Sequence, residues 1–133
     1  MVQKMYSSAN KALVKSFVED VFNKQDISAT EKYFAKKNPP IGSEEFKQSL
    51  SAQFKAFPDL QVKIEHIVAE NDLVVVFLNF TGTHKGEFQG MLPTNKKINI
   101  RSADVYRIEN EKIAEHWDVV DQLNLLQQTG ITL

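Results

Sequence analysis

The chain has 133 residues, the usual size of one domain, and we expect a single domain over residues 1–133. Hydrophobic residues make up 42% and charged residues 25%, a composition that excludes an intrinsically disordered chain. A net charge of −1 with both signs spread along the chain argues against a nucleic-acid or membrane partner, since both favour a basic surface, and the lack of cysteine excludes disulfides and thiolate chemistry.

Helical patterns dominate the first part of the chain. Apolar residues recur one turn apart over residues 8–22, which predicts a helix with one broad apolar face. Ser28, with Glu31 three residues later, is a capping-box pattern and predicts a short second helix through Phe34. The prolines and glycine in residues 38–42 predict a loop, and a third helix from about Ser43 ends at Pro58.

After Asp59 the pattern changes to the two-residue alternation of β-strands. Four strands are predicted, over residues 60–65, 73–83, 98–108 and 113–120, followed by a terminal helical turn or strand extension. Helices followed by an antiparallel meander indicate an α+β fold, in which helices back one face of a curved antiparallel sheet. Such a cone-shaped sheet cannot close its wide end with side chains alone, so we expect a pocket there.

No segment of the sequence suggests export or membrane insertion. Residues 1–6 lack the apolar core of a secretory signal, and the longest apolar run, residues 73–78, is far too short to span a bilayer. Together with the lack of cysteine, these features predict a cytoplasmic protein.

Several segments in the second half of the chain resemble the SnoaL-like polyketide cyclase, or ester cyclase, family. They are Phe57-Pro58-Asp59-Leu60, Ala69-Glu70-Asn71-Asp72, Gly82-Thr83-His84-Lys85-Gly86-Glu87-Phe88-Gln89-Gly90, Pro93-Thr94, Tyr106-Arg107-Ile108, Lys112-Ile113-Ala114-Glu115-His116-Trp117-Asp118 and Asp121-Gln122-Leu123-Asn124-Leu125-Leu126-Gln127-Gln128. The resemblance covers about residues 43–130. It implies the nuclear transport factor 2 fold, shared with ketosteroid isomerases, and cofactor-free aldol cyclisation with an aspartate that corresponds to Asp121.

The fourth strand and its neighbour supply the candidate site. If Asn110-Glu111 is a two-residue hairpin turn, Trp117 lies opposite Asp104. We take the face with Trp117 as the inner one, because Trp117 is the largest apolar side chain of the strand. Asp121, Asp104, Glu115 and His84 then converge on one cavity, whereas a β-bulge would invert this choice of face.

The expected chemistry is proton abstraction next to a carbonyl group. Asp121 is the candidate base, with its pKa raised by an apolar wall of Trp117, Phe54 and Phe57. Asp104, His84 or Tyr106 is the candidate hydrogen-bond donor to the developing enolate. The predicted ligand is a small apolar carbonyl compound. No cofactor is expected, and the three histidines are too far apart in sequence to form a short metal-binding motif.

Structural roles compete with these assignments. Asp121 also suits the N-cap of a terminal helix, and His84 suits a loop histidine bonded to backbone. Asp104 paired with Arg101 or Arg107 would be structural, and the aromatic residues suit the core. The strand at 73–83 is apolar on both faces, which supports a second hypothesis: a non-catalytic ligand-binding or dimerisation domain, with a homodimer formed through the outer sheet face.

Overall fold

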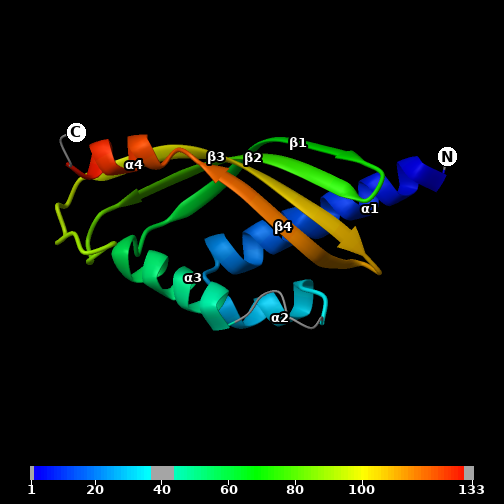
Figure 1. Cartoon of the computed structure of the whole chain (residues 1–133), viewed down its shortest axis with the longest axis horizontal. Helices are drawn as coiled ribbons and strands as arrows, with labels where there is room; N and C mark the ends of the chain where they lie inside the picture. Colours follow the sequence, from blue (N-terminus) through cyan, green and yellow to red (C-terminus); the bar gives the residue numbers. More distant parts are fainter. Residues whose placement is uncertain (1, 37–43, 131–133) are drawn as a thin grey trace.

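The computed structural model describes residues 2–36 and 44–130, and the helices come before the sheet (Figure 1). Helix α1 (Val2–Phe17) continues into a π-helical turn, η1 (Val18–Asn23). The 3-10 turn η2 (Ile27–Ala29) leads into α2 (Thr30–Tyr33), and α3 (Glu44–Ala56) follows. The predicted loop at residues 38–42 and the start at Ser43 lie outside the described residues. None of the described helices is long and apolar enough to cross a membrane.

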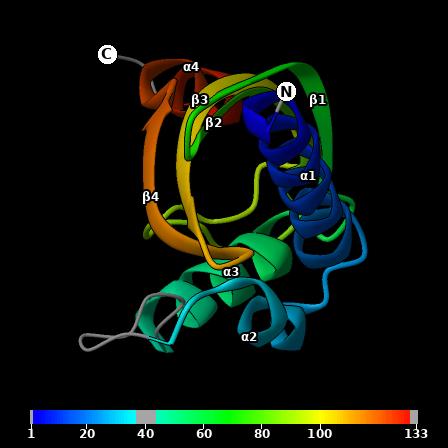
Figure 2. The same ribbon diagram turned by 90° about the vertical axis from the view of Figure 1, so that its right-hand side faces the viewer.

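The second half forms a four-stranded antiparallel meander in the order β1-β2-β3-β4. The strands are β1 (Gln61–Glu70), β2 (Leu73–Thr83), β3 (Lys97–Glu109) and β4 (Lys112–Val120), and α4 (Gln122–Thr129) closes the chain. Figure 2 shows the sheet curving around an interior, with α1 against β1 and β2 and α3 on the concave side. The predicted α+β fold with a helix-backed, curved antiparallel sheet is therefore confirmed.

Aromatic rings join the helices to the inner sheet face. Phe17, fully buried at the end of α1, makes edge-to-face contacts with Tyr33, Phe34 and Tyr106 at centroid distances of 5.4–5.7 Å. Such pairs add roughly 0.5–1.5 kcal/mol each to the free energy of unfolding beyond their area burial. The apolar stripe of the first helix thus faces the sheet, as the sequence predicts.

A β-bulge in β4 overturns the predicted pairing of β3 and β4. The two-residue turn at Asn110-Glu111 is confirmed, with φ of 50° and 62° and Glu109 opposite Lys112. Ile108 pairs with Ile113 but Arg107 pairs with Glu115, so Ala114 is an extra residue in β4. One extra residue exchanges the two faces of every later position. Trp117 consequently lies opposite Val105 rather than Asp104, on the outer face, and is 49% exposed.

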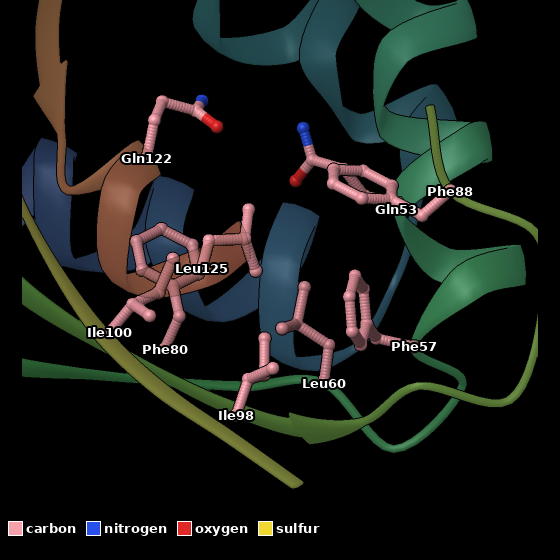
Figure 3. Close-up of a pocket in the computed structure, with 9 residues that line it drawn as sticks. All are labelled: Gln53, Phe57, Leu60, Phe80, Phe88, Ile98, Ile100, Gln122 and Leu125. Atoms are coloured by element: carbon pink, nitrogen blue, oxygen red, sulfur yellow. The ribbon is translucent and has the colours of Figure 1, made fainter. Parts of the chain in front are cut away.

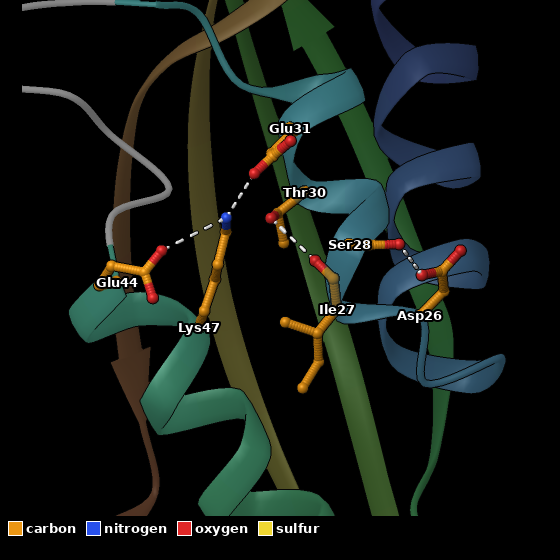
Figure 4. A network of polar contacts seen from close by, with 7 residues as sticks. All are labelled: Asp26, Ile27, Ser28, Thr30, Glu31, Glu44 and Lys47. Atoms are coloured by element: carbon orange, nitrogen blue, oxygen red, sulfur yellow. Dashed lines mark hydrogen bonds and ion pairs between the residues drawn. The ribbon is translucent and has the colours of Figure 1, made fainter.

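Figure 4 shows the polar contacts that join α2 to α3. The predicted capping box is wrong: Ser28 donates its hydroxyl hydrogen bond to Asp26, and α2 begins at Thr30. Glu31 instead binds Lys47 of α3, with Nζ and Oε1 2.7 Å apart. The hydrogen bond and the positive charge of Lys47 lower the pKa of Glu31 below its ordinary value. The contact ties α3, which carries part of the site, to the rest of the helical layer.

Candidate functional site

A polar cluster lies on the inner face of β3 and β4. The register places Tyr106 opposite His116 and Asp104 opposite Asp118, and the bulge at Ala114 turns both β4 side chains inward. Atoms of Asp104, His116 and Asp118 that could bind a metal or a proton lie within 4.8 Å of one another. Two antiparallel strands thus bring three titratable groups to one place, although they are up to 14 residues apart in sequence.

Asp104 is the centre of the cluster and is only 4% exposed. Its Oδ1 accepts a hydrogen bond from Ser102 Oγ at 2.8 Å, and its Oδ2 accepts one from the Tyr106 hydroxyl at 3.2 Å. The Nε2 atom of His116 lies 3.4 Å from Oδ2. A buried carboxylate needs such donors, because burying it unpaired costs several kcal/mol. The strand alternation supplies two of them, since Ser102, Asp104 and Tyr106 all point inward.

Tyr106 holds its proton and fixes the position of His116. The side chain is fully buried, and burial together with the adjacent Asp104 raises the pKa of Tyr106 well above its ordinary value. Its hydroxyl therefore remains a donor to Asp104. The Tyr106 ring also stacks on the His116 imidazole, with centroids 4.6 Å apart and an interplanar angle of 3°. The imidazole is thus held between an aromatic face and a carboxylate.

The cluster is open to solvent on the β4 side. The side chain of His116 is 20% exposed, and Asp118 is exposed. In the described part of the chain, Asp104, His116 and Asp118 form the one group of three that could hold a metal ion. Both oxygens of Asp104 already accept hydroxyl hydrogen bonds, which a metal would have to displace. The donor set therefore suits proton transfer better than metal binding, and a carboxylate beside an imidazole is a common proton-transfer pair.

The inner surface also holds an apolar cavity of about 90 Å³, whose lining residues are drawn in Figure 3. It is several times larger than the roughly 10–15 Å³ that one water molecule needs. Its lining residues come from α3, α4, the sheet and two loops: Gln53, Phe57, Leu60, Phe80, Phe88, Ile98, Ile100, Gln122 and Leu125. Ile98 and Ile100 precede Ser102 and Asp104 on the inner face of β3, so the cavity and the cluster occupy adjoining parts of one surface.

Asp121 and His84 lie elsewhere. Asp121 is the exposed N-cap of α4, and its two oxygens accept hydrogen bonds from the backbone and side-chain nitrogens of Asn124 at 3.2 and 2.9 Å. His84 is fully buried, and its Nδ1 accepts the backbone N–H of Thr94. This contact assigns the hydrogen to Nε2, for which the described residues supply no partner. The predicted N-cap and backbone-bonded histidine are confirmed, and neither residue lines the cavity.

The other predicted site residues divide between the two faces of the sheet. Glu115 lies on the outer face with Trp117 and binds Arg107, with Nε and Oε1 2.6 Å apart. Phe54 is a buried core residue, whereas Phe57 lines the cavity and Tyr106 belongs to the polar cluster. Of the predicted catalytic residues, only Asp104 lies in that cluster.

The site residues predicted from the sequence do not include Ser102, His116 or Asp118. Unbroken alternation from the turn predicts that His116 and Asp118 lie on the outer face with solvent, and the structure shows that this prediction is wrong. The neighbouring apolar residues Ile113 and Ala114, both buried, carry the signal of the bulge. An apolar pair directly after a tight turn indicates that the alternation of the strand is interrupted. With that interruption, His116 and Asp118 are predicted to point inward.

The family model for SnoaL-like polyketide cyclases matches residues 12–129, so the chain belongs to this family. AclR from Streptomyces galilaeus, assigned as a hydroxylase, is 31% identical, with a TM-score of 0.84 over 93% of this chain and 82% of AclR. A protein from Acidithiobacillus ferrooxidans assigned as a polyketide cyclase is 28% identical, with a TM-score of 0.79 over 91% of this chain and 94% of the relative.

The fold extends to more distant members of the same family. A SnoaL-like protein from Jannaschia sp. CCS1 is 20% identical, with a TM-score of 0.84 over 96% of each chain, a similarity that establishes the common nuclear transport factor 2-like fold. A comparison with curated protein sequences gave no match. The family and fold predicted from the sequence segments are thus confirmed.

Proposed function

We propose that this protein is a cofactor-independent enzyme of the cyclase or isomerase type that moves a proton next to a carbonyl group of a small apolar substrate. The observation that supports this proposal is the Asp104–His116–Asp118 cluster beside an apolar cavity on one inner surface. Membership of the SnoaL-like polyketide cyclase family agrees with it.

In the proposed reaction His116 is the base and Asp104 orients it. With the Nε2–H of His116 donated to Asp104, the Nδ1 lone pair takes a proton from the carbon next to the substrate carbonyl. In a cyclisation, the resulting enolate carbon forms a bond to a second carbonyl carbon of the same molecule. The new alkoxide oxygen then takes the proton back from Nδ1, so no proton, electron or co-reactant is gained or lost. Asp118 stabilises the transient imidazolium by its charge.

The test is α-proton exchange with solvent deuterium over a panel of small diketones and aromatic ketones, followed by NMR. His116→Gln and Asp104→Asn should lower the exchange rate by about 10²–10⁴-fold, the usual contribution of a positioned general base. Asp118→Asn should have a smaller effect.

Asp121→Asn is the matched control, because asparagine is an equally good N-cap and Asp121 lies outside the cluster. If Asp121→Asn abolishes exchange while His116→Gln retains it, the aspartate implied by the family resemblance is the base and our assignment is wrong.

We further propose that two copies of this chain associate through the outer sheet face. Cross-strand pairing creates two rows over all four strands, apolar except for His66: Val68, Val75, Val105 and Trp117 in one, and His66, Phe77, Ala103 and Val119 in the other. Val119 is 75% exposed and Phe77 is 47% exposed. An exposed, mostly apolar face of this kind is typical of a self-complementary dimer interface. The cysteine-free sequence also suits a reducing cytoplasm, where we expect the protein to act.

A further inference from the structure

Two glutamine side chains provide the polar part of the cavity lining. Gln53 comes from α3 and Gln122 from the first position of α4, whereas the remaining seven of the nine lining residues are apolar. Figure 3 shows the two amide groups directed toward one another above the ring of apolar side chains. Within the described residues, no charged side chain lines this cavity.

Both amides are available to a ligand. In the described part of the protein, Gln122 makes no side-chain hydrogen bond, and Gln53 makes only a long one, 3.4 Å from Nε2 to Ser49 Oγ. Gln128, also on α4, shows the contrast: its amide accepts from Asn99 N at 2.7 Å and donates to Asn99 O at 3.1 Å. The partners of Gln128 lie in the protein, whereas Gln53 and Gln122 have donor and acceptor positions to offer.

The mostly apolar lining of the cavity disfavours a charged ligand. A carboxylate or ammonium group moved into an apolar cavity loses its hydration and needs an opposite charge, which the lining does not supply. A neutral group with both a hydrogen-bond donor and an acceptor matches two carboxamides, each of which offers both. The space of about 90 Å³ below them is smaller than the roughly 150 Å³ cavity that encloses a whole benzene molecule, so it takes part of a single planar ring and no larger group.

We propose that Gln53 and Gln122 are specificity-determining residues that select a substrate whose ring end is uncharged and carries a donor and an acceptor, such as an amide or a hydroxy-ketone. This inference rests on the proposed function, because that function makes the cavity part of the substrate site. The reacting carbon lies at the polar cluster, at the other end of the ligand. Ile100 and Asp104 are four residues apart on β3, about 13 Å between Cα atoms, so the substrate is elongated.

The test compares two probes of nearly identical shape, benzamide and benzoate, by the NMR shifts of the methyl groups of Ile98, Ile100 and Leu125. We expect benzamide to bind at least about tenfold more tightly than benzoate. Replacing both glutamines, in Gln53→Leu/Gln122→Leu, should weaken benzamide binding by about 5- to 150-fold, since each lost hydrogen bond costs a factor of roughly 2–12. Gln48→Leu and Gln127→Leu, on exposed positions of the same two helices, are matched controls and should bind as the wild type does.

A single variant at the exposed position 122 keeps the test valid if the double variant does not fold. Gln122→Lys adds a positive charge at the mouth and should reverse the preference in favour of benzoate. Equal or tighter binding of benzoate by the wild type, unchanged binding by the double variant, or no methyl shifts up to about 10 mM benzamide would each overturn the inference.

Benzamide has no hydrogen on a carbon next to its carbonyl group, so it cannot undergo the proposed reaction and its binding is independent of turnover. Benzamide selectivity without α-proton exchange on any ketone would leave this inference standing and overturn the proposed function. Exchange without benzamide selectivity would do the reverse.

Discussion

The hydroxyl group of Tyr106 provides a direct test of how the buried carboxylate is stabilised. Tyr106→Phe removes the donor to Asp104 Oδ2 but keeps the ring, and with it the stack on His116 and the edge contact with Phe17 at 5.6 Å. Among the described residues, Asp104 then keeps Ser102 and His116 as partners. A hydrogen bond to a buried charged group contributes about 1.5–3 kcal/mol, so the free energy of unfolding should fall by about 2 kcal/mol. For a chain of this length, the melting temperature should fall by roughly 6–12 °C.

The assay is urea unfolding followed by circular dichroism, with a double-mutant cycle that adds Asp104→Asn. If the hydroxyl acts through the Asp104 charge, removing both groups should cost less than the sum of the single losses, by about 1 kcal/mol or more. Tyr33→Phe is the comparison, because its acceptor Asp20 is 27% exposed and the expected loss is below about 1 kcal/mol. A loss under about 0.5 kcal/mol for Tyr106→Phe, or strict additivity, would refute the view that this hydroxyl stabilises the buried carboxylate.

Three further perturbations address other parts of the molecule. Trp117→Arg, on the exposed outer face, should convert the proposed dimer to a folded monomer in sedimentation velocity, and an unchanged sedimentation coefficient would contradict the proposed interface. Gln128→Leu should lower the free energy of unfolding by about 1–2 kcal/mol and speed amide hydrogen exchange at Asn99. The reason is that the backbone N–H and C=O of Asn99, on the edge of β3 beyond the end of β4, lose their hydrogen bonds to the Gln128 amide. Unchanged exchange would show that water fully replaces that amide. Burial and the hydrogen bond to Asp20 raise the pKa of Tyr33 to about 12, so the stability that the protonated tyrosine contributes is complete below pH 10 and is lost as the pH rises toward 12. In urea titrations, Tyr33→Phe should therefore show a smaller loss of stability at alkaline pH than the wild type. An unaltered pH profile would assign the loss to other groups.

The candidate active site lies on the inner face of the sheet and the proposed dimer interface on the outer face, and the two faces differ in composition. The inner face combines a buried charge, a stacked imidazole and an apolar cavity, whereas the outer face carries two mostly apolar rows next to polar residues such as Asn79 and Arg101. One strand serves both, since alternate residues of β4 contribute His116 to the cluster and Trp117 to the outer row. An insertion or deletion in β4 would therefore damage both surfaces at once.

Much of the architecture can be predicted from the sequence because it depends on local patterns. The apolar spacing of the first helix, the stop at Pro58 and the alternation after Asp59 give the order of helices and strands. Asn71 and Asn110 adopt the positive φ that asparagine tolerates, and they lie in the β1–β2 and β3–β4 turns, the second of which the sequence predicts. The terminal helix and its cap at Asp121 are local in the same sense.

Only the tertiary structure decided which residues form the site. The apolar pair Ile113-Ala114 is a local sign of the bulge, but the pairing of β4 with β3 shows it, and it determines that His116 and Asp118 rather than Glu115 and Trp117 face the interior. Alternation along β3 supplies Ser102 and Tyr106 as partners of Asp104 and places Arg101 and Arg107 on the opposite face, whereas the partner His116 comes from the register with β4. Sequence patterns show that side chains alternate between the two faces of a strand, but not which of the two sets faces the interior. In β4, long-range packing determines which set does.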